Sequence, residues 1–429
     1  MIRGFDVAIV GGGIVGCYAA LHLAKAGHKV GLFEKGRIAG EQSSRNWGFV
    51  RMQGRDPAEI PLMIESKQMW RGLEAEIGEK VDWRQGGNLV LANSKERLAQ
   101  FENWLAIAKT FQVDSCMVTP AEAAKVVPGL QTGAVVGGLH TPSDGQAEPE
   151  KATPAIAEAA RRAGAHIETG CAVDRIEVSN GKVTGLLTES GSVRASAVIL
   201  CAGAWTKHML RGVGARMPQL WMRGTVARTS PSSRDGMATG VWAGVAFRQR
   251  IDGSFNIAGG TQADHDIMAD TLLDGLGFLP LLRMHNRALK LHFGTPFFDF
   301  LGVRLSQAAL GKALRRHRAL DPKPNPKSVA GSFQKLRDSI ADLGDVHIAK
   351  TWAGYIDFTP DFIPVIDRLD SPAGLVIAAG LSGHGFGMGP ITGRLAAELA
   401  TDGKPSLDIS AFRLSRFSDG TKILARNVI

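Results

Sequence analysis

Three glycines near the N-terminus have the spacing of a phosphate-binding loop. Gly11, Gly13 and Gly16 form a Gly-x-Gly-x-x-Gly sequence directly after the apolar run 5–10 and before an Ala- and Leu-rich stretch. In such a loop the first glycine permits a tight turn, the second lets a pyrophosphate approach the backbone, and the third lets a helix pack close to a strand. The phosphates then meet the N–H groups of the helix N-terminus, where anions are favoured. The chemistry indicated is the binding of a dinucleotide.

Glu34 limits which dinucleotide can bind. It ends a second apolar run, 28–34, where a carboxylate can accept a hydrogen bond from the adenosine ribose. A phosphate on that ribose would be repelled by the carboxylate, so NADP is disfavoured. Between the two runs, residues 14–26 have the composition of a helix that Gly27 ends. Residues 5–34 are thus expected to form a βαβ unit with parallel strands, and NAD and FAD both remain open.

The rest of the chain mixes short apolar runs with stretches of helical spacing, which predicts an α/β fold. A polar loop is expected at 41–56 and a mostly helical segment at 266–340. Helices are expected at 58–77, 93–112, 120–127, 149–163 and 391–400. Strands are expected at 87–92, 165–167, 172–178, 183–188, 192–200, 217–228, 241–250, 254–259, 346–353 and 375–379, with a hairpin at Asn180–Gly181. A NAD dehydrogenase would normally continue with βαβ units after residue 34, whereas this chain enters a polar loop.

Composition and charge exclude several classes of protein. The chain has 429 residues, of which 44% are hydrophobic and 21% charged, as in a globular protein of two domains or one composite domain. The net charge is +9, and segment 301–327 supplies six of these charges, with seven Lys and Arg residues against one Asp. The remainder is nearly balanced, so no nucleic-acid partner is predicted. The basic segment fits a solvated helical face, a contact between subunits, or a contact with a membrane surface or partner.

Cysteine usage and hydropathy bear on the compartment. The four cysteines form neither a Cys-x-x-Cys pair nor a metal-ligand spacing, which suits a reducing cytoplasm and predicts no metal. Glycine and polar residues interrupt the apolar stretch 7–26, so we do not expect a signal peptide. No run of about 18 apolar residues occurs, so no membrane span is expected. The prediction is a cytoplasmic protein, with contact to the inner face of the membrane through 301–327 left open.

Four groups of residues, in order along the chain, resemble the family of D-amino-acid oxidase, glycine oxidase and sarcosine oxidase. They are the glycine loop with Glu34, the loop Ser43–Ser44, the strand end Cys201-Ala202-Gly203-Ala204-Trp205, and the turn Ser382-Gly383-His384-Gly385-Phe386. A weaker match, Phe247-Arg248 to Gly259-Gly260, looks like a strand pair of the family's substrate domain. The resemblance covers nearly the whole chain and implies FAD as the cofactor.

The resemblance also implies an architecture. A Rossmann-like FAD domain of the glutathione reductase type would be interleaved with a substrate domain of the α+β class built on a mixed sheet. The FAD domain would comprise 1–84, 142–222 and 346–429. The substrate domain would comprise 85–141 and 223–345, with a mostly helical, basic insertion at about 266–340.

The resemblance places a defined set of residues at the cofactor. Ser43 and Ser44 would contact the pyrophosphate, and the turn at 383–387 would wrap the pyrimidine edge of the flavin, with the helix from 391 aimed at it. Backbone N–H groups there would stabilise the negative charge of a reduced flavin. The full set is Gly11, Gly13, Ile14, Val15, Gly16, Glu34, Lys35, Ser43, Ser44, Arg45, Asn46, Trp47, Gly48, Val173, Ala202, Gly203, Trp205, Gly354, Gly380, Gly383, His384, Gly385, Phe386 and Gly387.

Hydride transfer to a flavin needs placement of the substrate more than side-chain chemistry. An arginine is the natural anchor for a substrate carboxylate, because its fork matches the two oxygens. Arg51 falls close to the arginine that sarcosine oxidases use for this purpose, and Arg223 and Arg248 are further candidates. Tyr355 could wall the pocket or be a buried aromatic residue with a satisfied hydroxyl. His384 fits either a general base or a residue that shapes its glycine-rich loop.

Two departures from the family pattern matter. Sarcosine oxidases attach the flavin to a cysteine in a strand that here reads Lys350-Thr351-Trp352-Ala353, so FAD is expected to bind non-covalently. They also place a lysine where this chain has Gly387, which argues against sarcosine itself as the substrate.

The sequence therefore predicts oxidation of the C–N bond of a small, anionic amine to an imine, by hydride transfer to FAD. A D-amino acid or an N-substituted amino acid would be the substrate, and dioxygen or a quinone the electron acceptor. Two alternatives remain: an oxidase or dehydrogenase of 2-hydroxy acids, and a flavin subunit of a multi-component dehydrogenase that docks a partner through 301–327. The oligomeric state stays open.

Overall fold

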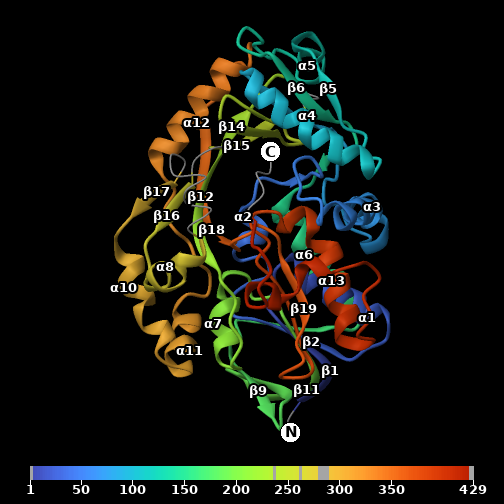
Figure 1. Cartoon of the computed structure of the whole chain (residues 1–429), viewed down its shortest axis with the longest axis vertical. Coiled ribbons are helices and arrows are strands. Elements are labelled where there is room, and N and C mark those ends of the chain that lie inside the picture. Colours follow the sequence, from blue (N-terminus) through green and yellow to red (C-terminus); the bar gives the residue numbers. More distant parts are fainter. Residues whose placement is uncertain (1–2, 235–237, 260–262, 279–288, 425–429) are drawn as a thin grey trace.

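Two large sheets organise the chain in the computed structural model, which describes residues 3–234, 238–259, 263–278 and 289–424 (Figure 1). Segments far apart in sequence contribute to both sheets. The predicted α/β class is confirmed. The division into two domains at the predicted boundaries stays a prediction.

The first sheet has the order β19-β20-β11-β1-β2-β8, with β10 and β9 continuing from β11 as a meander. Pairing is parallel from β20 through β8, so these strands bring their carboxyl ends to one edge. The strands are β1 (Arg3–Val10), β2 (Val30–Glu34), β8 (His166–Thr169), β9 (Val173–Ser179), β10 (Lys182–Thr188), β11 (Gly191–Leu200), β19 (Val365–Arg368) and β20 (Leu375–Ala379). The predicted βαβ unit at 5–34 is present.

Four helices pack together beside this sheet: α1 (Ile14–Lys25), α3 (Ile60–Ile77), α6 (Pro149–Arg162) and α13 (Gly385–Thr401). α1 is almost wholly buried, because its residues are small or apolar on every side. A Cβ on Gly393 would lie 2.6 Å from the carbonyl oxygen of Val15, so α13 approaches α1 as closely as a glycine permits. This packing fixes the N-termini of α1 and α13, which both open toward the edge described above.

The second sheet has the order β17-β16-β12-β15-β14-β13-β4-β6-β5, and β18 pairs with β12. β12 and β18 run antiparallel over a long stretch in which Arg223 lies opposite Tyr355. The strands are β4 (Asn88–Ala92), β5 (Cys116–Val118), β6 (Gly137–Thr141), β12 (Leu220–Pro231), β13 (Thr239–Trp242), β14 (Val245–Gln249), β15 (Ser254–Gly259), β16 (Ala263–Asp266), β17 (Leu289–His292) and β18 (Ile348–Phe358).

Short elements complete the structure. α4 (Lys95–Thr110) and α5 (Pro120–Val126) cover β4 to β6, and α12 (Pro326–Ser339) packs on β15. The loop after β2 contains α2 (Gln42–Arg45) and β3 (Phe49–Val50), and β3 pairs with β7 (Gly145–Gln146). The remaining helices are α7 (Thr206–Arg211), α8 (Ala269–Asp274), α10 (Thr295–Leu301) and α11 (Gln307–Arg316), with the short 3₁₀ helices η1 (Gly203–Trp205), η2 (Gly275–Phe278), η3 (Gly302–Arg304), η4 (Ser410–Phe412) and η5 (Leu414–Phe417).

Several predicted elements differ in the structure. The expected loop 41–56 contains α2 and β3. The expected strand 241–250 is divided into β13 and β14 by a tight turn, in which Ala243 and Gly244 have φ of 50° and 77°. The expected strand 346–353 continues to Phe358, and the expected helix at 391 already begins at Gly385. The segment 266–340 includes the strand β17, while residues 279–288 lie outside the described residues, as does Gly260.

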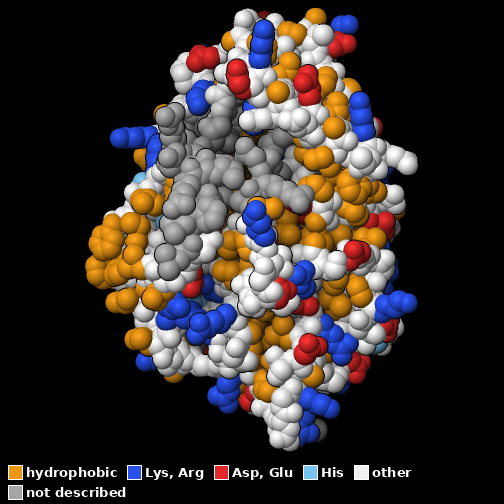
Figure 2. Space-filling model, in the orientation of Figure 1, with side chains coloured by type: hydrophobic (Ala, Val, Ile, Leu, Met, Phe, Trp, Pro, Cys, Tyr) orange, Lys and Arg blue, Asp and Glu red, His pale blue; other side chains and the backbone are white. Residues whose placement is uncertain are grey.

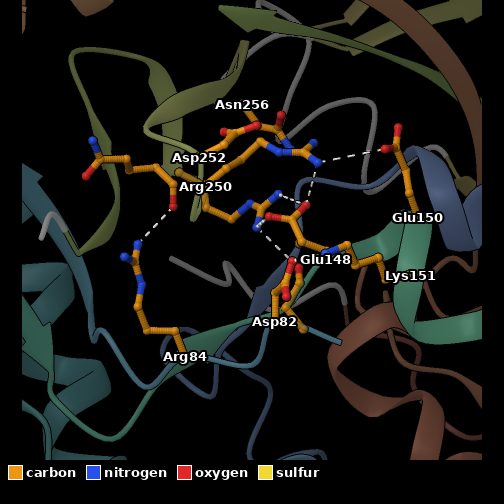
Figure 3. A network of polar contacts seen from close by, with 12 residues as sticks. Asp82, Arg84, Glu148, Glu150, Lys151, Arg250, Asp252 and Asn256 are labelled. Carbon is orange, nitrogen blue, oxygen red and sulfur yellow. Dashed lines mark hydrogen bonds and ion pairs between the residues drawn. The ribbon is translucent and has the colours of Figure 1, made fainter. Parts of the chain in front are cut away.

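A buried ionic network joins the second sheet to the start of α6 (Figure 3). Glu148 directly precedes α6. Its carboxylate accepts hydrogen bonds from Arg248 at 3.0 and 3.1 Å and forms an ion pair with Arg250 at 2.9 Å. Arg248 is only 1% exposed. Removing one member of such a buried pair leaves the other charge uncompensated, so loss of either Arg248 or Glu148 would destabilise the fold. Within the described residues no helix is long and apolar enough to cross a membrane.

Candidate active site

A cavity of about 580 Å³ lies between the two sheets. One wall comes from the carboxyl ends of β1, β2 and β11, and the other from residues 222–226 of β12 and the C-terminal half of β18. The turn at 383–386 closes one end. The volume falls within the usual range for ligand sites, which are about 300–1,000 Å³.

Most residues predicted from the sequence line this cavity. They come from strands and loops that are far apart in the chain. Those at the lining are Gly11, Gly13, Ile14, Val15, Glu34, Lys35, Ser43, Arg45, Asn46, Trp47, Arg51, Val173, Ala202, Gly203, Trp205, Arg223, Gly354, Tyr355, Gly383, His384, Gly385 and Phe386.

The glycine loop has the shape that a phosphate site needs. Gly11 has φ of 112°, and a Cβ there would lie 2.5 Å from the carbonyl oxygen of Cys201. A Cβ on Gly16 would lie 2.1 Å from the carbonyl oxygen of Gly11, so this glycine sets the close contact of α1 with the loop. Gly13 precedes α1, and a Cβ there would meet only Ser43 Oγ, at 3.2 Å. A bound anion would take the place that such a methyl group would occupy.

The end of the cavity that lies away from the turn at 383–386 has features suited to an adenosine. Glu34 accepts hydrogen bonds from the backbone N–H groups of Gly12 and Gly36, both at 2.7 Å, which fixes its carboxylate at the lining. Burial raises the pKa of Glu34 above its usual range, against the effect of these N–H donors. Lys35 lies over the Trp205 ring, with Nζ 5.3 Å from its centroid, and donates to the carbonyl of His317. The C-terminal end of α11 is therefore tied to this end of the cavity.

His384 and Glu59 form a largely buried pair at the turn. His384 directly precedes α13 and Glu59 directly precedes α3, and His384 Nδ1 lies 2.9 Å from Glu59 Oε1. Burial, followed by the charge of Arg55, lowers the pKa of His384, so its ring is neutral at pH 7. Because a carboxylate only accepts, Nδ1 carries the proton and Nε2 is left as an acceptor. Glu59 is fully buried, and its Oε2 has no hydrogen-bond partner among the described residues.

Two arginines stand beside this pair at the lining. Arg55 is buried and donates from Nε to the backbone carbonyl of Arg51, at 3.1 Å. Arg51 donates to the carbonyl of Gln53, at 3.0 Å. Burial, followed by the charge of Arg55, lowers the pKa of Arg51 to about 10, so Arg51 is still a cation at pH 7. The two guanidinium groups make this end of the cavity attractive to a carboxylate.

Arg223 and Tyr355 lie on the wall formed by β12 and β18, and both contact Asp266. The Tyr355 hydroxyl donates to Asp266 at 2.7 Å, and Arg223 forms an ion pair with the same carboxylate at 3.4 Å. Burial, followed by this hydrogen bond, raises the pKa of Tyr355 above its usual range. Tyr355 is thus both a wall of the cavity and a buried aromatic residue with a satisfied hydroxyl, so its two predicted roles coincide. The charge of Arg223 is already neutralised by the Asp266 carboxylate.

Comparison with known proteins identifies the scaffold. The family model described as FAD dependent oxidoreductase (DAO) matches residues 6–399. The chain belongs to this family. It is 27% identical to human peroxisomal sarcosine oxidase over 96% of both chains. It is 25% identical to mouse mitochondrial sarcosine dehydrogenase over 96% of its own residues, although it spans only 41% of that protein's length. The structure of an L-amino acid deaminase from Proteus myxofaciens, in complex with anthranilate, superposes with a TM-score of 0.90 at 27% identity, over 97% of this chain and 94% of that one.

The FAD dependent oxidoreductase family uses FAD, and the cavity fits it. The glycine loop leaves room for a pyrophosphate where a Cβ would otherwise lie, and Glu34 stands at the adenosine end. The N-terminus of α13 faces the other end, where its N–H groups and dipole favour negative charge. FAD would be held by these residues and supply the capacity to accept a hydride.

Some predicted residues do not line the cavity. Ser44 points the other way and donates to the carbonyl of Ala39 at 2.6 Å, because neighbouring residues of α2 face different sides. Gly16 and Gly48 pack against Gly11 and Arg248, and Gly380 packs against Met217 and Thr359. The carbonyl of Gly387 accepts from Ser66 and Trp70, so this residue faces α3. Arg248 is enclosed in its pair with Glu148, so it was wrongly considered as a substrate anchor.

Sequence reasoning missed five charged residues at or behind the lining: Glu41, Arg55, Glu59, Asp264 and Asp357. Arg55 and Glu59 lie one turn apart in a segment that looked like a loop leading into a helix. A glutamate at a helix start is commonly a surface residue, and only its contact with His384 reveals its burial. Asp264 and Asp357 lie in strands, where a single acidic residue gives no signal of a site.

Asp357 provides a test of the electrostatics of this cavity. It is fully buried and accepts hydrogen bonds from Gln219 Nε2 at 2.8 Å and from the Gly380 N–H at 2.9 Å. Burial outweighs these donors and raises the pKa of Asp357 to about 6. The folded state therefore binds this proton more tightly than the unfolded state, and its contribution to stability is lost as pH rises from about 4 through 6.

We expect the Asp357→Asn variant to lack this loss. Relative to the natural protein, its free energy of unfolding should rise by about 3 kcal/mol between pH 4 and pH 8, since the shift is about two pKa units. Urea unfolding of the FAD-free protein at both values would measure this change. A constant difference between the two proteins would show that Asp357 is ionised in the fold at both pH values.

Proposed function

We propose that the protein oxidises the C–N bond of a small amino acid or secondary amine to an imine. The observation that carries the proposal is the pair of guanidinium groups, Arg51 and Arg55, at the same end of the cavity as the turn at 383–386. They offer a carboxylate a charge-assisted anchor beside the residues that face the flavin. The relatives named for sarcosine and amino-acid oxidation support the same class of substrate.

The residues of the chain would position the substrate and manage its proton. Arg51 would hold the carboxylate through two hydrogen bonds. Neutral His384 would accept a proton from the ammonium group at Nε2, which leaves the nitrogen lone pair able to assist the loss of hydride. Glu59 would keep His384 in this tautomer through Nδ1. FAD supplies the acceptor for the hydride, and the imine product would then be hydrolysed by water.

Finer features of the proposal come from positions at which the sequence departs from the pattern of sarcosine oxidases. The strand residues 350–353 contain no cysteine, which supports non-covalent FAD. Gly387 faces α3 and lies outside the cavity, so the absence of a lysine there does not limit the substrate. The substrate would be a D-amino acid or an N-substituted amino acid. Dioxygen or a quinone would accept the electrons, and the basic segment 301–327 would contact a membrane or partner.

Loss of the visible flavin absorbance without oxygen tests the proposal. The purified yellow protein would be mixed with D- and L-amino acids, N-alkyl amino acids, opines and 2-hydroxy acids. We expect fast bleaching by one class of amine and none by 2-hydroxy acids. Readmitting air then separates an oxidase, which turns yellow again, from a dehydrogenase that needs a quinone. A protein bleached only by hydroxy acids would contradict the proposal, and one bleached by no compound would favour a subunit that needs a partner.

A further inference from the structure

One face of the molecule exposes an unusual amount of apolar surface. Of the twelve large hydrophobic side chains that are exposed in the described part of the chain, seven lie between residues 272 and 305. The other five are scattered over elements that are far apart in the chain. We call the group of seven the apolar face; it consists of Leu272, Leu273, Leu291, Phe293, Phe298, Leu301 and Leu305.

The apolar face is built from neighbouring short elements. Leu291 in β17 and Phe293 directly after this strand are both well exposed. Phe293 packs against Phe298 with 5.9 Å between ring centroids, which joins β17 to α10. α10 ends at Leu301 and contacts α8, whose C-terminal half carries Leu272 and Leu273, while Leu305 follows η3. In Figure 1 α8 and α10 form the outer edge of the molecule, and Figure 2 shows apolar side chains gathered at that edge. The face is therefore convex.

The exposed charged side chains in the segment that carries most of the apolar face are positive. Between residues 289 and 316 the charged side chains that are exposed are Lys290, Lys312 and Arg316. The two acidic groups in and near this stretch, Asp274 and Asp299, are only partly exposed and form ion pairs with Arg304 and Arg316. The predicted basic segment thus contributes fewer available charges than its composition implies, since Arg315 and Arg318 pair with Asp174 and Glu189.

We propose that the apolar face docks the protein on the surface of a bilayer that contains anionic phospholipids. Apolar side chains rimmed by cations are the pattern that binds at the boundary between headgroups and acyl chains. α8 and α10 have six and seven residues, so they could lie in this boundary but not cross it. A bilayer adapts to a convex surface, whereas a second protein would need a matching hollow. A soluble monomer rarely leaves such a patch exposed.

Co-sedimentation with phospholipid vesicles tests the proposal. One set of vesicles would be phosphatidylcholine alone, and the other would include about a third phosphatidylglycerol to supply negative charge. We expect the full-length, FAD-loaded protein to bind both, and the anionic vesicles at least about tenfold more tightly. Phe293→Ser combined with Phe298→Ser should weaken binding to both sets by about tenfold or more. Lys312→Glu combined with Arg316→Glu should remove only the preference for anionic vesicles.

A matched control shows whether weaker vesicle binding is specific to the apolar face or follows from any loss of exposed apolar side chains. Ile107→Ser combined with Val136→Ser removes two exposed apolar side chains elsewhere, and binding should not change. All the substituted residues are exposed and lie outside the cavity, so the visible flavin absorbance should stay at the natural value. If the natural protein pellets with neither kind of vesicle, the proposal is wrong. It is also wrong if the protein is a dimer without vesicles and the double serine variant is a monomer, because the face then joins two copies.

Discussion

Changing Arg51 to glutamine is expected to lower kcat/KM for the amine substrate by about thirty- to five-thousand-fold, with FAD content unchanged. Arg51 lines the cavity at the flavin end and remains a cation despite its burial. Removing one partner of a buried, hydrogen-bonded charge pair costs about 2–5 kcal/mol, which corresponds to this range of rates. Stopped-flow bleaching of the flavin under nitrogen would measure it without interference from the electron acceptor.

Two further variants make the assignment specific. Arg51→Lys keeps the positive charge but not the planar fork, so its loss should lie between the natural protein and the glutamine variant. Arg223→Gln is the matched control, because Arg223 is already paired with Asp266 on the facing wall. If Arg223→Gln loses the activity and Arg51→Gln keeps it, the carboxylate anchor is Arg223. The carboxylate of the substrate then points toward the wall formed by β12 and β18.

Changing Gly13 to alanine should weaken FAD binding by about a hundredfold while leaving the fold intact. Gly13 has φ of −78°, which an alanine adopts without strain, and the new methyl group would meet only Ser43 Oγ at 3.2 Å. That methyl group occupies the path by which a pyrophosphate reaches the backbone N–H groups. Hydrogen bonds to a charged group contribute about 1.5–3 kcal/mol each, so losing one or two of them gives this effect. Titration of the FAD-free protein with FAD would measure the dissociation constant.

Comparison with two other glycines shows whether the effect is local. Gly4→Ala introduces a methyl group that meets no atom within 4 Å, so FAD affinity should be unchanged. Gly16→Ala would force a methyl group within 2.1 Å of the Gly11 carbonyl oxygen, so this variant should lose the fold as well as the cofactor. Unchanged FAD affinity in Gly13→Ala would mean that the pyrophosphate lies elsewhere in the cavity.

Features encoded by consecutive residues could be predicted from the sequence. The βαβ unit at 5–34 contains its own signals: two apolar runs, a glycine turn and a helix that a glycine ends. The same holds for the hairpin at Asn180–Gly181, where both residues have positive φ in the structure. The turn at 383–386 was found because its glycines and its resemblance to a known family coincide. These local patterns were sufficient to bring most cavity residues together.

Features that depend on distant partners could not be predicted. Glu59 and His384 are 325 residues apart, and Arg248 and Glu148 are 100 residues apart. Nothing near either residue in sequence shows whether its charge is exposed, paired or directed into a cavity. The expected strand 346–353 is shorter than β18, which continues to Phe358. Its residue Asp357 is buried there because distant partners, Gln219 and Gly380, satisfy its carboxylate.

The order of strands in the first sheet has a consequence for biosynthesis. β11 lies between β1 and β20, so the cofactor site needs residues from both ends of the chain. At a translation rate of about 5–20 residues per second, the last of these strands follows the first by roughly 20 to 75 seconds. A ligand stabilises only the state that it can bind, so FAD cannot protect the nascent chain. Cells short of flavin would therefore complete the polypeptide but leave it open to proteolysis, and the amount of protein would follow the supply of the vitamin.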